Sequence, residues 1–179
     1  MKAIILASGI GKRLRPLTDK KPKSLIKINN KTILEYQLDI LKKCNITNVI
    51  ITTGPFADEI QRFVKEKYKD FTFLFVPNPQ YDTTNYIYSL WLTKDYIDDD
   101  ILLLHGDLIF TEKLLKKMIK TNGNVVPVNN KIEVPEKDFK AVIDNNKVKK
   151  IGVNFFGKNT FFSLPLYKFT KKGFLSLDE

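Results

Sequence analysis

The chain has 179 residues, 43% of them hydrophobic and 28% charged, which is typical of one globular domain in solution. No apolar run approaches the roughly 20 residues that a membrane helix needs, and the single cysteine, Cys44, excludes an internal disulfide, so we expect a cytoplasmic protein without a membrane partner. The net charge is +10, but the lysines are scattered in ones and twos, which favours a solvated surface over a binding face for nucleic acid.

Strands and helices are predicted to alternate over the first two thirds of the chain. Short apolar or β-branched runs predict buried strands at residues 2–6, 48–52, 71–76 and 101–105. Helical periodicity predicts helices at residues 32–44, 56–67, 84–96 and 111–120. The first helix begins with the capping box Thr32-Ile33-Leu34-Glu35. This alternation is typical of βαβ units, so we expect an α/β fold with a mixed, mainly parallel central sheet flanked by helices.

Shorter strands are predicted after about residue 124, at residues 125–128, 139–143, 148–153 and 160–164. Asp144-Asn145-Asn146-Lys147 joins two of them and is a hairpin signal. The segment 175–179 is expected to start a helix. Because the sequence contains no internal repeat, low-complexity segment or interdomain linker, residues 1–179 are predicted to form a single domain.

Small, polar or acidic residues follow each of the four predicted parallel strands, at residues 7–13, 53–55, 77–79 and 106–107. In open α/β sheets, ligands bind in the crevice beyond the carboxyl ends of the strands. These four segments therefore predict a ligand-binding crevice at one edge of the sheet.

The loop Ser8-Gly9-Ile10-Gly11-Lys12-Arg13 is the strongest functional signal in the chain. Its glycines allow backbone N–H groups to turn toward a phosphate, and two cations follow them. It is not a Walker A loop, because Arg13 follows Lys12. It is not a dinucleotide fingerprint either, because Leu14 stands where a third glycine is needed. A tight structural turn also explains a glycine pair after a strand, so the loop alone leaves both interpretations open.

The loop and the residues that follow it resemble the signature of the sugar-phosphate nucleotidyltransferase superfamily. The resemblance rests on residues 6–18, on Lys21-Pro22-Lys23-Ser24-Leu25, on Glu35-Tyr36-Gln37 and on Gly106-Asp107. It implies a Rossmann-like fold of the nucleotide-diphospho-sugar transferase type.

A narrower resemblance concerns the acceptor. Asn85-Tyr86-Ile87-Tyr88-Ser89-Leu90 is similar to the small cytidylyltransferase branch, which includes choline-phosphate and aminoethylphosphonate cytidylyltransferases. Residues 138–141, 151–153 and 164–167 are most similar to the CTP:phosphoglutamine cytidylyltransferases of capsule phosphoramidate synthesis. This branch implies CTP and a small phosphorylated acceptor as partners.

The superfamily resemblance implies a Mg²⁺-dependent reaction in which an acceptor phosphate attacks the α-phosphorus of a nucleoside triphosphate and pyrophosphate leaves. Such catalysis depends on positioning and charge neutralisation. Lys23 and Arg13 are the implied catalytic residues, with Lys23 at the α-phosphate and incoming phosphate and Arg13 at the triphosphate. Asp107 is the implied magnesium ligand. A surface lysine and a turn aspartate are the alternatives for Lys23 and Asp107.

The implied nucleotide-binding residues lie at the strand ends and around Asn85, where backbone, amide and hydroxyl groups can read the polar edge of a base. They are Leu6, Ala7, Ser8, Gly9, Gly11, Lys12, Arg13, Thr53, Gly54, Asn78, Asn85 and Ser89. A helix cap is the alternative interpretation of Asn85. His105, the only histidine, is interpreted as structural, and Trp91, Phe155 and Phe156 as core.

Two features depart from the superfamily pattern. Lys12 stands where serine or threonine is usual, which adds a charge near the phosphates. Related enzymes also continue further and supply a second metal-binding carboxylate from a late segment. We therefore expect residues 1–179 to be a domain truncated at its C-terminus, with a substitute such as Asp144 as the alternative.

The sequence thus predicts a cytidylyltransferase that moves CMP from CTP to phosphoglutamine, or to a phosphocholine-like or aminophosphonate-like acceptor. One rival is a sugar-1-phosphate nucleotidyltransferase that uses UTP, dTTP or GTP. Other rivals are a nucleotide-binding module without turnover and, from charge alone, an RNA-binding protein. The assembly state is left open, with a homodimer as one option.

Overall fold

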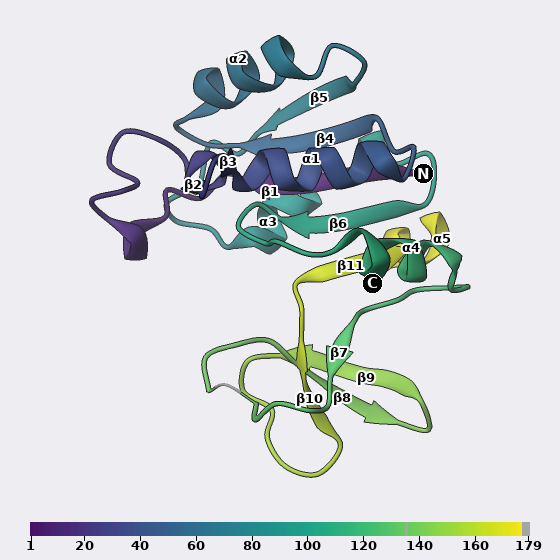
Figure 1. The fold of residues 1–179 in the computed structure, drawn as a ribbon. Coiled ribbons are helices and arrows are strands. Elements are labelled where there is room, and N and C mark those ends of the chain that lie inside the picture. The colour runs from purple at the N-terminus through teal and green to yellow at the C-terminus, as the bar shows by residue number, and fades with distance from the viewer. Residues whose placement is uncertain (135, 177–179) are drawn as a thin grey trace.

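The computed structural model describes residues 1–134 and 136–176. Its central sheet has the strand order β11-β6-β1-β4-β5 (Figure 1). Four strands run parallel, and β11 alone is antiparallel to its neighbour β6, so the prediction of a mixed, mainly parallel sheet is confirmed. The strands are β1 (Lys2–Ala7), β4 (Asn48–Thr53), β5 (Thr72–Pro77), β6 (Ile101–His105) and β11 (Leu166–Phe169).

Helices cover both faces of this sheet because successive strand residues point to opposite sides. Ile5 packs with the cluster under α1 (Ile33–Lys43), α2 (Ala57–Lys67) and α4 (Glu112–Lys120). Its neighbour Ile4 packs on the other face, under α3 (Tyr86–Trp91) and α5 (Lys171–Leu175). Four short elements lie between β1 and α1 in the sequence, namely η1 (Lys12–Leu14), η2 (Lys23–Leu25), β2 (Lys27–Ile28) and β3 (Lys31–Thr32).

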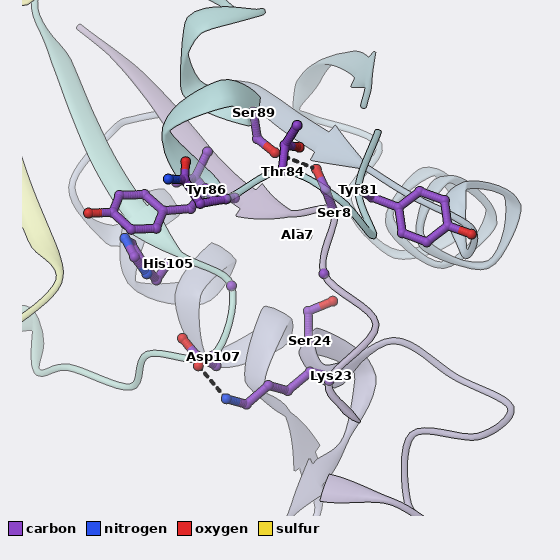
Figure 2. Close-up of a pocket in the computed structure, with 15 residues that line it drawn as sticks. Ala7, Ser8, Lys23, Ser24, Tyr81, Thr84, Tyr86, Ser89, His105 and Asp107 are labelled. Carbon is purple, nitrogen blue, oxygen red and sulfur yellow. Dashed lines mark hydrogen bonds and ion pairs between the residues drawn. The ribbon is translucent and has the colours of Figure 1, made fainter. Parts of the chain in front are cut away.

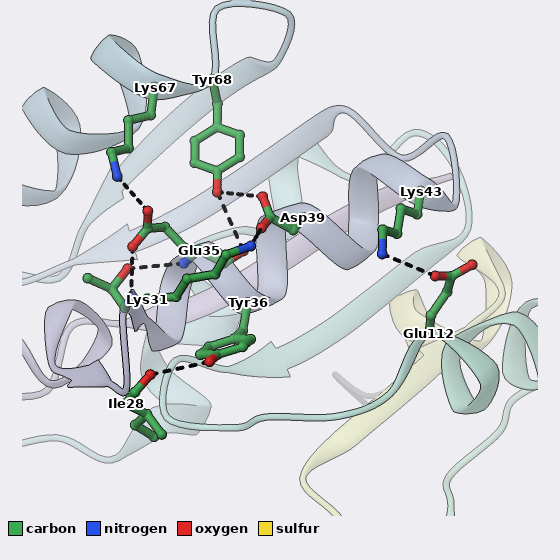
Figure 3. Close-up of polar contacts among 10 residues, drawn as sticks. Ile28, Lys31, Glu35, Tyr36, Asp39, Lys43, Lys67, Tyr68 and Glu112 are labelled. Carbon is green, nitrogen blue, oxygen red and sulfur yellow. Dashed lines mark hydrogen bonds and ion pairs between the residues drawn. The ribbon is translucent and has the colours of Figure 1, made fainter.

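The predicted capping box at the start of α1 is confirmed (Figure 3). The Thr32 hydroxyl accepts a hydrogen bond from the Glu35 backbone N–H at 3.1 Å, and the Glu35 carboxylate accepts one from the Thr32 N–H at 2.7 Å. One turn later the Tyr68 hydroxyl donates to the Asp39 carboxylate at 2.9 Å. Burial raises the pKa of that hydroxyl, and the carboxylate raises it further. The capping box thus fixes the start of α1, and the Tyr68 contact ties the middle of α1 to the end of α2.

A second, smaller sheet follows α4, and it lies below the central sheet in Figure 1. Its strand order is β7-β10-β8-β9, with β7 (Val128–Asn129), β8 (Lys140–Asp144), β9 (Lys147–Gly152) and β10 (Thr160–Ser163). The predicted hairpin between β8 and β9 is confirmed. Val125 and Lys168 close the stem of this excursion, because each backbone N–H donates to the other residue's carbonyl, at 2.8 and 2.9 Å.

Several predicted boundaries differ from the structure. The helix predicted over residues 84–96 is interrupted, because α3 ends at Trp91 and a separate 3₁₀ turn, η3 (Lys94–Tyr96), follows it. The segment 125–128 forms one bridge and the start of β7 instead of a full strand. The helix expected from residue 175 begins earlier, at Lys171, and residues 177–179 of that expectation lie outside the described residues.

Two aromatic residues that we interpreted as core are exposed. Trp91 is 44% and Phe156 63% solvent-exposed, whereas Phe155 is partly buried. The core interpretation is therefore wrong for Trp91 and Phe156. In the described part of the chain, every helix falls short of the length and apolar character needed to span a membrane.

Candidate active site

A cavity of about 190 Å³ opens at the carboxyl ends of β1 and β6 (Figure 2). This is the edge of the sheet where the strand-end rule placed the ligand. Nine of the residues proposed from the sequence line it, namely Leu6, Ala7, Ser8, Gly9, Gly11, Lys23, Asn85, Ser89 and Asp107. The wall also contains Ser24, Tyr81, Thr84, Tyr86, His105 and Gly106.

The glycine loop forms one wall of the cavity and requires glycine at position 11. Gly11 has a φ of +64°, a left-handed conformation that residues with a Cβ rarely adopt. An added Cβ would also lie 2.9 Å from the Thr18 side chain and 3.4 Å from Lys23. The Thr18 hydroxyl donates to the Gly11 carbonyl at 2.9 Å, which fixes the turn. The loop is therefore pressed against the segment that carries Lys23.

Lys23 and Asp107 meet at the floor of the cavity, where the ammonium contacts the carboxylate as an ion pair (Figure 2). The sequence assigned these two residues separate roles, one at the phosphates and one at the metal. Their side chains are 36% and 38% exposed, so water screens the pair and its contribution to stability is at most about 1 kcal/mol. The contact matters chiefly because it brings an ammonium cation and a carboxylate, the type of group that can bind Mg²⁺, to one point.

Gln37 holds the turn that carries Asp107. This side chain of α1 is fully buried, and its amide nitrogen donates to the carbonyls of His105 and Leu108, both at 2.8 Å. The two acceptors flank Asp107 in sequence, so the amide binds the backbone on both sides of it. Gln37 belonged to a motif noted in the sequence, but the position of its side chain needed the fold.

A chain of buried polar groups supports the opposite side of the cavity, and Figure 2 shows its central link between Ser89 and Ser8. The Asn78 amide donates to the Ser89 hydroxyl at 2.9 Å, Ser89 donates to the Ser8 hydroxyl at 3.3 Å, and Ser8 donates to the Thr52 hydroxyl at 2.9 Å. All four side chains are buried. The chain connects α3, the loop after β1 and the ends of β4 and β5. It fixes the two serines that face the cavity.

Three predicted nucleotide-binding residues lie behind this wall, outside the set that lines the cavity. Asn78 supports Ser89, as described above. Thr53 is buried at the end of β4, and Gly54 packs against the Ser8 backbone. Asn85 lines the cavity and also caps α3, since its side chain accepts from the Ile87 N–H at 2.9 Å. The alternative interpretation of Asn85 as a cap is thus confirmed alongside its place in the wall.

Lys12 and Arg13 lie on an adjoining groove. The groove shares Gly11, Lys23 and Tyr81 with the main cavity. Both cationic side chains are exposed there. A polyphosphate that extends from the cavity past Gly11 would therefore meet Lys12 and Arg13 on its outward path.

His105 is part of the cavity wall as well as of the packing beneath it. Its ring lies 4.9 Å from the Tyr86 ring and 6.2 Å from the Phe139 ring, between centroids. Burial lowers the pKa of the imidazole below its ordinary value, so the ring is neutral near pH 7. Our sequence interpretation of His105 as structural covered its packing and missed its place in the wall.

Asp107 offers the cavity one carboxylate, which would suit a magnesium ion whose other ligands are phosphates and waters. Mg²⁺ commonly takes one or two protein carboxylates and completes its shell with phosphates and waters. Among the described residues no group of three or more His, Cys, Asp or Glu side chains is arranged to hold a metal. Asp144, the suggested substitute for a second carboxylate, lines a different cavity in the smaller sheet, beside Asn145 and Phe161.

Comparisons with known proteins match the part of the chain that contains the cavity residues. A family model described as nucleotidyl transferase covers residues 2–139. Choline-phosphate cytidylyltransferase from Streptococcus pneumoniae is 38% identical over 110 residues, which are 62% of this chain and 46% of that protein. CTP:phosphoglutamine cytidylyltransferase from Campylobacter jejuni is 30% identical over 137 residues, which are 73% of this chain and 53% of that protein. The chain thus spans about half the length of these curated relatives.

Solved structures support the fold. A structure of CTP:phosphocholine cytidylyltransferase from Streptococcus pneumoniae superimposes with a TM-score of 0.73 and 27% identity, covering 98% of this chain and 73% of that chain. The fold described above is therefore shared with that cytidylyltransferase.

Proposed function

The chain belongs to the nucleotidyl transferase family, and from this we propose that it transfers CMP from CTP to a small phosphorylated acceptor. The observation that carries the proposal is the meeting of the glycine loop, Lys23 and Asp107 on one cavity. The cytidylyltransferases among its relatives support the choice of nucleotide. A reaction that consumes CTP suits the cytosol, which we propose as its compartment.

The proposed reaction is a displacement at the α-phosphorus of CTP. An oxygen of the acceptor phosphate forms the new P–O bond, the bond between the α-phosphorus and the bridging oxygen breaks, and that oxygen leaves on pyrophosphate. Two polyanions must approach each other, so the protein's task is to neutralise and align them. Lys23 supplies a compact positive charge between the two phosphates. Backbone N–H groups of residues 9–11 and the Arg13 guanidinium bind the departing end of the triphosphate.

Asp107 would hold Mg²⁺, which when bound neutralises charge on the nucleotide phosphates. The Lys23 ammonium already contacts this carboxylate, so phosphates gathered at Asp107 also lie beside Lys23. Gln37 keeps the Asp107 turn in place by its two hydrogen bonds to the backbone.

For the acceptor we propose phosphoglutamine or a phosphocholine-like or aminophosphonate-like compound. The names of the relatives support this class. The direct test is pyrophosphate release by the purified chain with Mg²⁺, using CTP, UTP, GTP, ATP and dTTP against phosphocholine, aminoethylphosphonate, phosphoglutamine and glucose 1-phosphate. Turnover that requires CTP and one of the first three acceptors supports the proposal. Turnover confined to glucose 1-phosphate with UTP or dTTP would replace it with a sugar-nucleotide activity.

CTP is expected to raise the melting temperature more than UTP does. A ligand at about 100 times its Kd stabilises the native state by about 2.7 kcal/mol, and a tenfold weaker ligand by about 1.4 kcal/mol less. For a chain of this size, that difference corresponds to roughly 3 °C or more. The physical reason is that a site built for the cytosine amino group leaves polar groups unpaired against uracil. The measurement is a thermal shift with Mg²⁺ at equal nucleotide concentrations.

Ser89→Ala is the informative variant for the same assay, because Ser89 faces the cavity and is held by Asn78. The CTP preference should shrink in this variant, whereas Ser176→Ala, at an exposed helix end, should keep it. Equal shifts for CTP and UTP with the wild-type chain would contradict the cytidylyl assignment and leave the transferase class intact.

A further inference from the structure

Lys140 is a fully buried cation in β8, where the smaller sheet approaches the cavity. Its ammonium donates to the backbone carbonyls of Glu136, Asp138 and Val153, at 2.7, 3.1 and 2.6 Å. The ammonium also lies over the Phe156 ring, 4.4 Å from its centroid. Lysine has three N–H donors, so the three carbonyls satisfy all of them.

This arrangement constrains the backbone strongly. Within the described ranges no carboxylate lies at ion-pair distance from Lys140, so carbonyl dipoles and one aromatic face alone replace its water shell. A buried charge is tolerated only when its hydrogen bonds are made with good geometry. The carbonyls therefore have to stay where the ammonium can reach them. They belong to the segment before β8 and to the residue after β9, and Lys140 ties these two segments together.

The residue inside this tie is Phe139, and its ring touches the wall of the cavity. The Phe139 ring lies edge-on to Tyr86, at 5.7 Å between centroids, and edge-on to His105, at 6.2 Å. Tyr86 and His105 both line the cavity. Among the described residues, these two ring contacts are the only aromatic contacts between the smaller sheet and this wall. The position of Phe139 therefore affects the shape of the wall.

We propose that Lys140 is a positioning residue that holds Phe139 against Tyr86 and His105 and thereby sets the affinity for the phosphorylated acceptor. This inference rests on the proposed function. In that function the glycine loop, Ser8 and Ser89 serve the nucleotide, which leaves the Tyr86 and His105 wall beside Asp107 for the acceptor. Loss of the Lys140 ammonium frees the segment 136–139 and moves this wall while the nucleotide side keeps its own supports.

The kinetic test compares Lys140→Met with Lys168→Met. Lys168 is the matched control, because it is also a buried lysine that donates to backbone carbonyls, those of Ile119 and Thr121 at the end of α4. Lys140→Met is expected to raise the KM for phosphocholine, or for whichever acceptor gives turnover, by at least about fivefold, with the KM for CTP changed less than about twofold. Lys168→Met should leave the ratio of the two KM values unchanged. Equal changes in both KM values for Lys140→Met, or no change in the acceptor KM, overturn the inference.

Two milder variants keep the test usable if Lys140→Met does not fold. Lys140→Gln retains two of the N–H donors, and Phe139→Ala removes the ring through which Lys140 is proposed to act. Both are expected to show the same acceptor-selective rise in KM. A normal acceptor KM in both variants overturns the inference.

A spectroscopic readout separates this inference from the proposed function. His105 is the only histidine, so its imidazole protons give a single assignable set of NMR signals. The Phe139 ring current acts on these protons, and Lys140→Gln should displace the signals while Lys168→Met leaves them in place. If the wild-type chain releases no pyrophosphate with any acceptor, the proposed function fails, and unchanged His105 signals in Lys140→Gln then overturn the positioning role as well.

Discussion

Replacement of Lys23 by alanine is expected to lower kcat/KM by at least about 100-fold, because one positioned charge at a transferring phosphoryl group contributes several kcal/mol. The structure gives a physical reason for this role of Lys23, in addition to its sequence motif. Lys23 contacts the carboxylate of Asp107, so its ammonium sits at the point where nucleotide and acceptor phosphates are proposed to converge. The measurement is initial-rate pyrophosphate release by the variant and the wild-type chain.

Lys27→Ala is the matched control for that experiment. Lys27 lies only four residues further on and is exposed in β2, away from the cavity wall. Its removal changes the net charge equally and should leave kcat/KM within about twofold. A Lys23→Ala variant that keeps more than about a third of wild-type activity would remove Lys23 from the proposed mechanism.

Gly54→Ala is expected to lower the free energy of unfolding by about 2 kcal/mol or more, the range found for side chains forced into close-packed sites. A Cβ at this position would lie 2.1 Å from the Ser8 carbonyl oxygen and 3.3 Å from the Tyr81 side chain. The loop after β1 must then move, and nucleotide affinity should fall with stability. Urea denaturation with and without CTP measures both effects.

Gly9→Ala is the control that separates the effect of steric crowding from the effect of losing a glycine. An added Cβ at Gly9 meets nothing within 4 Å, so the same substitution should cost well under about 1 kcal/mol of unfolding free energy. If both variants unfold at the same urea concentration as the wild type, the close approach of the β4 end to Ser8 is not a structural requirement.

The strands and most of the helices could be predicted from the sequence because their signals are local. β1 and β6 are apolar runs, and α1 carries its capping box in four consecutive residues. The strand-end rule then sufficed to bring residues 8–11 and Asp107 to one edge of the sheet, although about a hundred residues separate them. The sequence did not predict β11. This strand pairs with β6 because the chain comes back to the central sheet after the smaller sheet, and no local residue pattern indicates that pairing.

Side-chain roles within the site were harder to predict, because they depend on what lies across the cavity. Gln37 and Ser24 stood in recognised motifs, but the sequence does not show that Gln37 binds the backbone around Asp107. Asn78 is predicted to bind the nucleotide, and the structure shows that its amide supports Ser89 behind the cavity wall. A polar residue at a strand end can face either a ligand or a neighbouring side chain, and only the packing of the folded chain decides between the two.

The two hydrogen bonds between Val125 and Lys168 give the smaller sheet a closed stem. The segment that forms the smaller sheet has its two ends already joined at the central sheet. Lengthening this segment therefore costs only loop entropy, about 0.6 kcal/mol for each doubling of its length. Insertions and replacements between β7 and β10 can thus accumulate without disturbing β1, β4 or the glycine loop. Under the proposed function, the fold separates a fixed half for the nucleotide from a half that selection can rebuild for a new acceptor.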